Sequence, residues 1–362
     1  MNVLVFILKM HSLRYSMVSP GSGTVRFSGS LDSYRDRASV LEMLAKLKER
    51  VSGSSGPAGE QDPPVLAFRL PYGGDLFRGP ELVGPGSLAR LQELIPQAPL
   101  HLPAVLSLIE CAGEVFDGCP GVLVSETAFF LDLPARERLV ALDFDLVRKM
   151  GIRHYGFNGT LHQAACAQVR QERRRAGLGS CPKIVSICLE SRPEVAAVIG
   201  HRPVMVTSGT TPLEGFPGST TCGELDPGIV ITLAQELGWG PEQINQMLTS
   251  QSGLKGLTGE NTDLGAVFSL DRENYLPARE VVRYRLLTSC GAAKAAMGGL
   301  DAIVFSGQYA GLGETLGPQL TANPALAGQG GAKTTWELFL KPRERVIAEI
   351  AAAATPAACP AA

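Results

Sequence analysis

The chain has 362 residues, 45% of them hydrophobic, so it can bury a large core and is too long for one ordinary domain. Its 33 Lys and Arg nearly balance its 35 Asp and Glu, and the formal net charge of −2 argues against the basic surface that nucleic-acid binding requires. We therefore expect two domains, a small-molecule ligand and no nucleic-acid partner.

The eight cysteines form no C-x-x-C pair and have no histidines nearby at zinc-ligand spacing, so we interpret them as reduced core thiols. No stretch approaches the roughly 20 apolar residues of a membrane span. The apolar run 3–8 has no basic residue before it and is followed by Lys9, a pattern that favours a first β-strand over a signal peptide. These features predict a cytoplasmic protein without a membrane partner.

In the first part of the chain, leucines at helical spacing predict a helix at 39–51, and apolar runs predict strands. The strands are expected at 3–8, 13–18, 24–27 and 65–70. Arg69 lies at the end of the last strand, before a Pro-Tyr-Gly-Gly turn. Its guanidinium fork suits a carboxylate or a phosphate, which makes it a candidate anion ligand; pairing with a surface acid is the alternative.

The middle of the chain is expected to alternate helices and strands. An apolar strand that begins at residue 121 leads into Glu126. The segment RHYGFNGTLH (153–162) stands between two predicted helices, and the second of these precedes a predicted strand. The predicted elements are two helices within 86–110, helices at 135–150 and 164–175, and a strand at 183–189.

The stretch 204–227 reads VMVTSGTTPLEGFPGSTTCGELDP. It begins as an apolar strand and then breaks into small, hydroxyl, glycine and proline residues. A loop of this composition after a buried strand lets the backbone approach another group closely, and we interpret that group as a ligand.

The last third of the chain is predicted to be mainly helical, with a strand at 301–305. That strand leads into a turn with Gly311, Gly313 and Glu314; an ordinary strand-to-helix loop is the alternative interpretation. The alanine- and proline-rich end, 354–362, is typical of a disordered tail. The predicted helices are 228–237, 241–250, 280–297 and 334–353.

Several segments together resemble the acetate and propionate kinase family, whose motifs include TSMGFTPLEG, GTRSGDIDP, RRYGFHGTSH and GGLDAIVF. The corresponding segments here are TSGTTPLEG (207–215), STTCGELDP (219–227), RHYGFNGTLH (153–162) and GGLDAIVF (298–305). The resemblance implies an α/β chain with the two-domain actin-like (ribonuclease H-like) acetate kinase fold and an interdomain cleft. The implied domains are 1–127 plus about 315–353 for the N-terminal domain, 128–314 for the nucleotide-binding domain, and 354–362 for the tail.

The resemblance also implies catalytic positions. Arg69 matches the family's arginine that binds the substrate carboxylate or the transferred phosphoryl group, and Glu126 matches the aspartate that positions the substrate. Asn158 stands where the family has the histidine that hydrogen-bonds the phosphoryl group, and Thr221 stands where it has a second arginine.

ATP and Mg²⁺ are the cofactors that the resemblance implies. Glu314 matches a glutamate that helps to hold magnesium, whereas Ile7 replaces the metal-side asparagine. Glu190 and Arg192 replace two glycines of the family's phosphate loop. The implied nucleotide-binding positions are Arg14, Thr207, Gly209, Asp263, Gly311 and Gly313.

Two functions follow from the resemblance and the substitutions. The first is a homodimeric phosphotransferase that makes an acyl phosphate and ADP from ATP and a short-chain carboxylate. Its activity would be weak or altered, with a phosphate site rearranged around Arg14, Lys9 or Arg192. The second is a catalytically inactive relative that serves as a binding or regulatory module.

Overall fold

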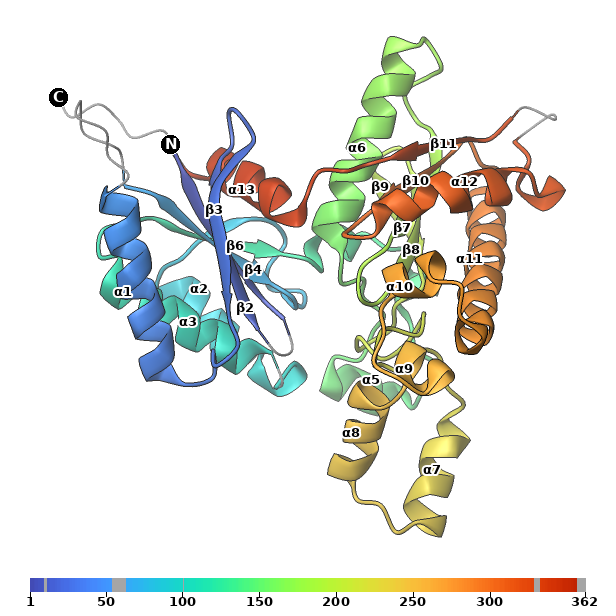
Figure 1. The fold of residues 1–362 in the computed structure, drawn as a ribbon, viewed down its shortest axis with the longest axis horizontal. Helices are drawn as coiled ribbons and strands as arrows, with labels where there is room; N and C mark the ends of the chain where they lie inside the picture. The colour runs from blue at the N-terminus through green and yellow to red at the C-terminus, as the bar shows by residue number, and fades with distance from the viewer. Residues whose placement is uncertain (10–11, 54–62, 100, 329–332, 357–362) are drawn as a thin grey trace. The chain divides into compact units, whose positions relative to one another are not determined.

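The computed structural model describes residues 1–9, 12–53, 63–99, 101–328 and 333–356, and its chain divides into two compact units (Figure 1). The first unit comprises Met1–Leu131 and Pro342–Ala362, and the second comprises Asp132–Lys341. Each unit is built on one β-sheet with helices packed against it. The expected α/β class is confirmed.

The sheet of the first unit has the strand order β3-β2-β1-β4-β6-β5. Its first three strands form an antiparallel meander, to which β4 and β6 add in parallel. The apolar runs of β1, β4 and β6 are buried on both faces, as parallel central strands require. The strands are β1 Val3–Leu8, β2 Leu13–Ser19, β3 Thr24–Leu31, β4 Val65–Leu70, β5 Glu81–Leu82 and β6 Gly121–Ser125.

Successive strand residues point to opposite faces of the first sheet, so its buried central strands present apolar side chains on both faces, and helices pack against them. Val3 and Val5 share a buried cluster with Ile347 and Ala351 of the last helix, α13. Helix α1 packs against α3, which contacts β4. The helices are α1 Arg37–Gly53, α2 Pro85–Glu93, α3 Leu102–Val115 and α13 Arg343–Ala354, with 3₁₀ turns η1 Ile95–Gln97 and η2 Ala128–Phe130.

The sheet of the second unit has the order β11-β10-β7-β8-β9. The strands β7, β8 and β9 form two successive hairpins, and β10 and β11 pair in parallel beside β7. These strands are β7 Lys183–Cys188, β8 Glu194–Ile199, β9 Arg202–Val206, β10 Ala302–Ser306 and β11 Thr335–Leu338.

Two long helices cover this sheet. Helix α11 packs on β7, β8 and β9 and buries Val282, Leu286 and Cys290 in the core, while α6 packs on β7 and β10. The helices are α4 Ala135–Arg138, α5 Phe144–Met150, α6 Gly159–Arg175, α7 Pro227–Glu236, α8 Pro241–Ser250, α9 Gly253–Thr258, α10 Leu264–Ser269, α11 Leu276–Met297 and α12 Gly313–Thr321. The 3₁₀ turns are η3 Glu273–Tyr275, η4 Ala310–Leu312 and η5 Pro324–Leu326.

Two predicted helices are wrong as single elements. The segment 334–353 contains strand β11, which pairs with β10, and then α13, which begins after Pro342. Residues 335–338 pair with β10, and Pro342 is the N-cap residue of α13, so the helix begins only after it. The segment 135–150 is two short helices, because the chain is extended at Leu139 and restarts at Asp143, whose side chain accepts a hydrogen bond from Leu146 N at 2.9 Å.

Residues 315–341 lie in the second unit, where α12 and β11 pack together and β11 completes the sheet. The sequence-based boundary near residue 315 therefore moves to Lys341, and only the chain from Pro342 onward returns to the first unit. Of the expected tail 354–362, residues 357–362 lie outside the described residues.

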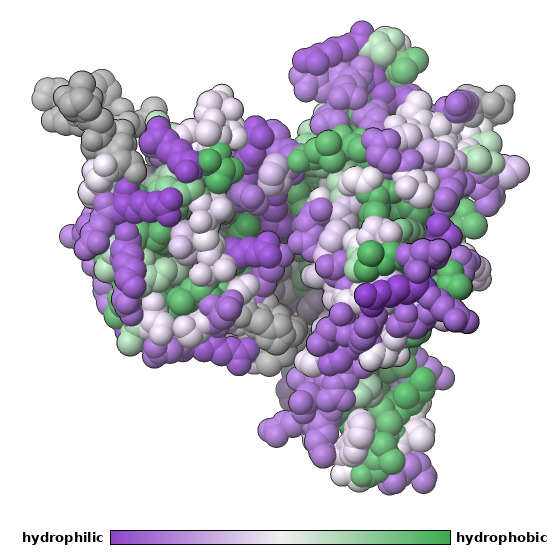
Figure 2. Space-filling model, viewed as in Figure 1, coloured by the Kyte–Doolittle hydropathy of each residue, from purple (hydrophilic) through white to green (hydrophobic). Residues whose placement is uncertain are grey.

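The part of the chain that the structure describes contains no helix long and apolar enough to span a membrane. One apolar helix is nevertheless uncovered. None of the α7 residues is buried, and Ile229, Ile231 and the adjoining Leu237 are 45%, 57% and 54% exposed. Hydrophobic residues gather over α7 at the bottom of the view in Figure 2.

The close packing around Gly313, the first residue of α12, predicts that a larger side chain there destabilises the fold. A Cβ at Gly313 would lie 2.5 Å from Leu338 Cδ2 and 2.8 Å from the Phe305 ring, whereas a Cβ at Gly311 meets no atom within 4 Å. We expect Gly313→Ala to lower the free energy of unfolding by about 1–3 kcal/mol through overpacking. Gly311→Ala is the matched control and should change it by about 0.5 kcal/mol or less. Denaturant unfolding measures both; equal effects would contradict the packing role of Gly313.

Candidate functional site

In the first unit, one buried carboxylate binds two guanidinium groups. Arg69, near the end of β4, donates from Nε to Glu126 Oε1 at 2.6 Å, and Arg343, the first residue of α13, donates from Nη1 to the same oxygen. The Glu126 side chain is fully buried, and those of Arg69 and Arg343 are 14% and 9% exposed. The predicted residues Arg69 and Glu126 are therefore in direct contact.

The ends of β4 and β6 hold this cluster in place. Glu126 N donates to the Leu70 carbonyl at 3.0 Å. This hydrogen bond continues the pairing of β4 with β6 by one residue, so the strand pairing fixes the position of Glu126. Its neighbour Thr127 accepts a hydrogen bond from Gly73 N at 3.0 Å. A side chain at Gly73 would collide with Ser125, which explains the glycine in this turn.

Two guanidinium groups share one carboxylate in this cluster, and His101 lies close enough for Arg69 to affect it. Burial, and then the charges of Arg69 and Arg35, lower the pKa of His101. The guanidinium groups of the cluster are of the kind that bind carboxylate and phosphate anions.

The sequence pattern does not single out Arg343 as a site residue. A basic residue at the first position of a helix opposes the helix dipole, and such placement is a signal that the side chain has another partner. That partner, Glu126, is 217 positions away in the sequence, so only the folded chain identifies it.

In the second unit, the carboxylate of Glu194 is fully buried at the start of β8. Its Oε2 accepts a hydrogen bond from Phe157 N at 2.9 Å, and its Oε1 accepts one from Asn158 N at 2.9 Å. His162 Nε2 lies 3.2 Å from Oε1, and Ser208 Oγ donates to Oε2. Both carboxylate oxygens are thus bound by donors from helix α6, from the two residues before it and from the loop after β9.

A second layer of contacts fixes these donors. His162 Nδ1 lies 2.8 Å from Ser186 Oγ on β7. Arg192 donates from Nη1 to Ser208 Oγ at 2.9 Å, and its Nη2 lies 3.9 Å from Glu194 Oε2. Burial by itself would raise the pKa of Glu194, but the hydrogen bond and charge of His162, the charge of Arg192 and the Ser208 hydroxyl together lower it to about 2.

The sequence pattern does not single out Glu194 either, because a glutamate beside the apolar run VAAVI reads equally well as the residue before a strand. Two predicted residues lie near it. Asn158 is the N-cap residue of α6, 6% exposed, and its backbone N–H binds Glu194. Thr207 Oγ1 accepts a hydrogen bond from Val195 N at 3.0 Å and so ties the glycine-rich loop to β8.

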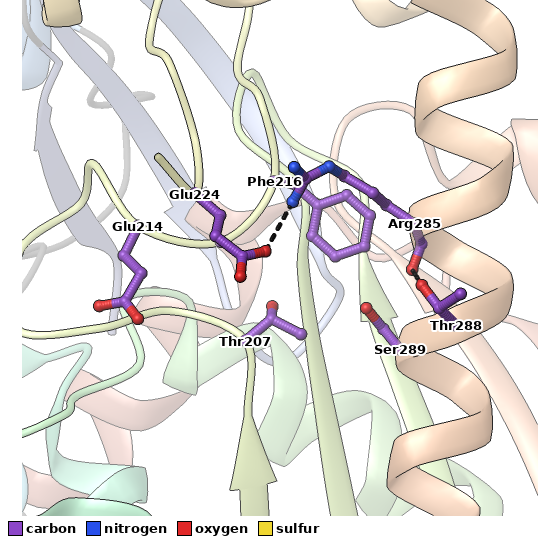
Figure 3. A pocket seen from close by; sticks show the side chains of 8 residues that line it. Thr207, Glu214, Phe216, Glu224, Arg285, Thr288 and Ser289 are labelled. Atoms are coloured by element: carbon purple, nitrogen blue, oxygen red, sulfur yellow. Dashed lines mark hydrogen bonds and ion pairs between the residues drawn. The ribbon is translucent and has the colours of Figure 1, made fainter. Parts of the chain in front are cut away.

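The glycine-rich loop 207–227 borders a pocket of about 210 Å³ (Figure 3). In the figure Glu224 faces Arg285 across it, and Thr288 and Ser289 project from α11. The Glu224 and Arg285 side chains form an ion pair at 2.9 Å. The lining residues are Thr207, Glu214, Gly215, Phe216, Glu224, Arg285, Thr288 and Ser289.

Other predicted positions of this loop have packing contacts. Gly209 accepts a hydrogen bond from Tyr155 N at 3.0 Å, and a side chain there would collide with the Glu214 carboxylate. Thr221 Oγ1 is buried and has no hydrogen-bond partner among the described residues. Neither position provides a cationic side chain to the loop.

The remaining predicted nucleotide positions come from separate elements, and the Asp263 side chain hydrogen-bonds Tyr309, the residue before η4. Asp263 caps α10 by accepting a hydrogen bond from Ala266 N at 2.8 Å, and Gly311 is exposed in η4. Gly313 packs against Phe305 and Leu338 as described above. Glu314 is exposed in the first turn of α12, and in the first unit Arg14 is exposed on β2.

The lowered pKa of Glu194 predicts how the free energy of unfolding depends on pH. Its ordinary pKa of 4.5 falls to about 2 in the folded protein, so the unfolded chain binds the proton more readily. The contribution of the ionised carboxylate is on the order of 3 kcal/mol, is present above pH 4.5 and is lost as the pH falls toward 2. We expect the stability gap between wild type and Glu194→Gln, measured by denaturant unfolding, to shrink over this range. A gap that is independent of pH would contradict an ionised Glu194.

Comparisons with known proteins agree with this architecture. The sequence model of the Acetokinase family matches residues 32–317. The chain is 34% identical over 257 residues to the acetate kinase of Syntrophobacter fumaroxidans, an alignment that spans 70% of this chain but only 61% of that protein. It is 33% identical over 302 residues to the acetate kinase of Clavibacter michiganensis, with 81% of this chain and 74% of that one covered.

Solved structures give the same fold. The crystal structure of Porphyromonas gingivalis acetate kinase has a TM-score of 0.83 and 25% identity, with 98% of this chain and 99% of that chain covered. A propionate kinase from Francisella tularensis has a TM-score of 0.80 at 21% identity, with 96% and 98% covered, and supports the fold alone. The family predicted from the sequence motifs is confirmed: the chain belongs to the acetokinase family and has the acetate kinase fold.

Proposed function

We propose that this chain is an acetate kinase-like phosphotransferase that converts ATP and a short-chain carboxylate into an acyl phosphate and ADP, with low turnover. The observation that carries the proposal is the Glu126 carboxylate held between Arg69 and Arg343. Membership of the acetokinase family supports the reaction class.

The two guanidinium groups would bind the carboxylate of the acid substrate. Each offers planar N–H donors whose geometry matches a carboxylate. Glu126 acts as a positioning residue, because it fixes both guanidinium groups from a buried site. This arrangement supports a small anionic substrate.

Low turnover follows from the replaced groups. Phosphoryl transfer depends on positioning and on neutralising charge in the transition state, and losing one arginine costs on the order of a thousandfold or more. Thr221 provides no charge at the position of the family's second arginine. Asn158 is neutral, and its backbone N–H is bound to Glu194.

The residues fit magnesium poorly. Among the described residues no three acidic, histidine or cysteine side chains gather into a possible metal site. Ile7 offers no ligand atom, and Glu314 is an exposed carboxylate on α12. Any magnesium would therefore be held chiefly by nucleotide phosphates, and no catalytic step is assigned to it.

A second candidate function is a non-catalytic binding module. It is favoured by the interval 190–194, which the family fills with a glycine-rich turn. Glu190 Oε1 accepts a hydrogen bond from Gln308 N at 3.3 Å, Pro193 has no N–H, and Glu194 is a buried carboxylate. Carboxylates in this interval repel phosphate.

The reaction is tested by assaying acyl phosphate formation from MgATP with acetate, propionate and butyrate. We expect wild-type activity above that of Arg69→Ala, with kcat/KM about a thousandfold below that of the Porphyromonas gingivalis enzyme measured alongside. Arg343→Ala should raise KM for the acid by about tenfold or more. Arg345→Ala, a residue of the same helix that lies beside Gly23, is the matched control. If the wild type forms no more acyl phosphate than a blank without enzyme, the phosphotransferase function is excluded and the binding-module function remains.

The uncovered helix α7 supports a homodimer, because an apolar helix without buried residues gains stability from a partner surface. We expect sedimentation analysis to give a dimer, and Ile231→Asp to shift it toward monomer by placing a charge in the interface. Asn245→Asp adds a charge to an exposed position of α8 and should leave the dimer intact. A monomeric wild type, or a dimer unaffected by Ile231→Asp, would exclude α7 as the interface.

A further inference from the structure

The Glu194 carboxylate lies in a cradle of hydrogen-bond donors drawn from separate parts of the second unit. Phe157 N and Asn158 N come from the two residues before α6, His162 from its first turn, and Ser208 from the loop after β9. We call these four groups, together with the Arg192 guanidinium, the Glu194 cradle.

The chemistry of the cradle is that of an oxyanion site. Neighbouring backbone N–H groups in a turn bind phosphate and carboxylate groups, and Phe157 N and Asn158 N are two such neighbours directly before α6. A hydroxyl, an imidazole and a guanidinium are also usual phosphate ligands. Four of these groups contact the Glu194 carboxylate directly, whereas Arg192 donates to Ser208 Oγ and lies 3.9 Å from the carboxylate.

The present occupant of the cradle is an oxyanion from the chain itself. The first residue of β8 is fully buried, a position that an apolar or small side chain fills at less cost. A glutamate is tolerated there because both of its oxygens are hydrogen-bonded. The carboxylate therefore replaces a ligand anion in its contacts.

We propose that Glu194 is a built-in oxyanion that fills a phosphate-binding cradle in the second unit and excludes inorganic phosphate or the terminal phosphate of a nucleotide from it. The cradle is then a latent anion site that opens when the carboxylate is removed. The proposal bears on the proposed phosphotransfer, because a filled cradle is one cause of low turnover. It does not require that reaction, since it rests on the contacts of one unit.

The test compares full-length wild type, Glu194→Ser and Glu194→Gln. Serine removes the carboxylate and leaves the donors in place, whereas glutamine keeps the side-chain volume and removes only the charge. Inorganic phosphate is titrated into each protein by calorimetry, and thermal unfolding is followed in phosphate and in chloride of equal ionic strength. We expect phosphate to bind Glu194→Ser about tenfold or more tightly than wild type and to raise its unfolding temperature. Glu194→Gln should bind as weakly as wild type.

A further variant assigns the binding to the cradle. Arg192→Ala in the Glu194→Ser background should weaken phosphate binding by about tenfold or more, because it removes the cationic donor. If Glu194→Ser does not fold in chloride, recovery of folded protein in phosphate is the supporting result. Equal phosphate affinity in wild type and Glu194→Ser, or an unfolded variant that phosphate does not restore, would overturn the proposal. These readouts do not depend on turnover, so an inactive wild type would refute the phosphotransferase and leave the cradle standing.

Discussion

A buried carboxylate must be matched by donors, and in the second unit this constraint acts through Glu194. Its ligands connect β8, the beginning of α6 and the loop after β9, and His162 extends the network to Ser186 on β7. Removing one donor would leave an unsatisfied charge in the core, at a cost of several kcal/mol. The local order of this site therefore depends on keeping the carboxylate ionised and fully bound.

The first unit is subject to the same constraint, because Glu126 is also a fully buried carboxylate. There one buried glutamate binds two guanidinium groups. One unit thus carries a buried arginine–glutamate cluster, and in the other the donors around Glu194 bind that side chain. A family fold is retained while its charge pattern is altered, which is why fold and activity must be argued separately.

Local sequence patterns were enough for most of the fold. The apolar runs near 65–70, 183–189 and 301–305 are strands in the structure, and the family motifs identified the acetate kinase fold. Sequence pattern failed at 334–353, because pairing with β10 is a non-local effect that helical spacing does not reveal. Arg69 and Glu126, which the sequence pointed to separately, are in contact in the structure, and their catalytic roles stay predictions. Arg343 and Glu194 could not be found this way, since their roles depend on partners far away in the sequence.

The most direct test of this account is the ionisation of Glu194 itself. The side-chain carboxyl carbon can be followed by ¹³C NMR during a pH titration, with Glu194→Gln used to assign the resonance. The account predicts an ionised carboxylate throughout the neutral and mildly acidic range, with protonation only as the pH approaches about 2. A resonance that titrates near the ordinary value of 4.5, or that is already protonated at neutral pH, would contradict it.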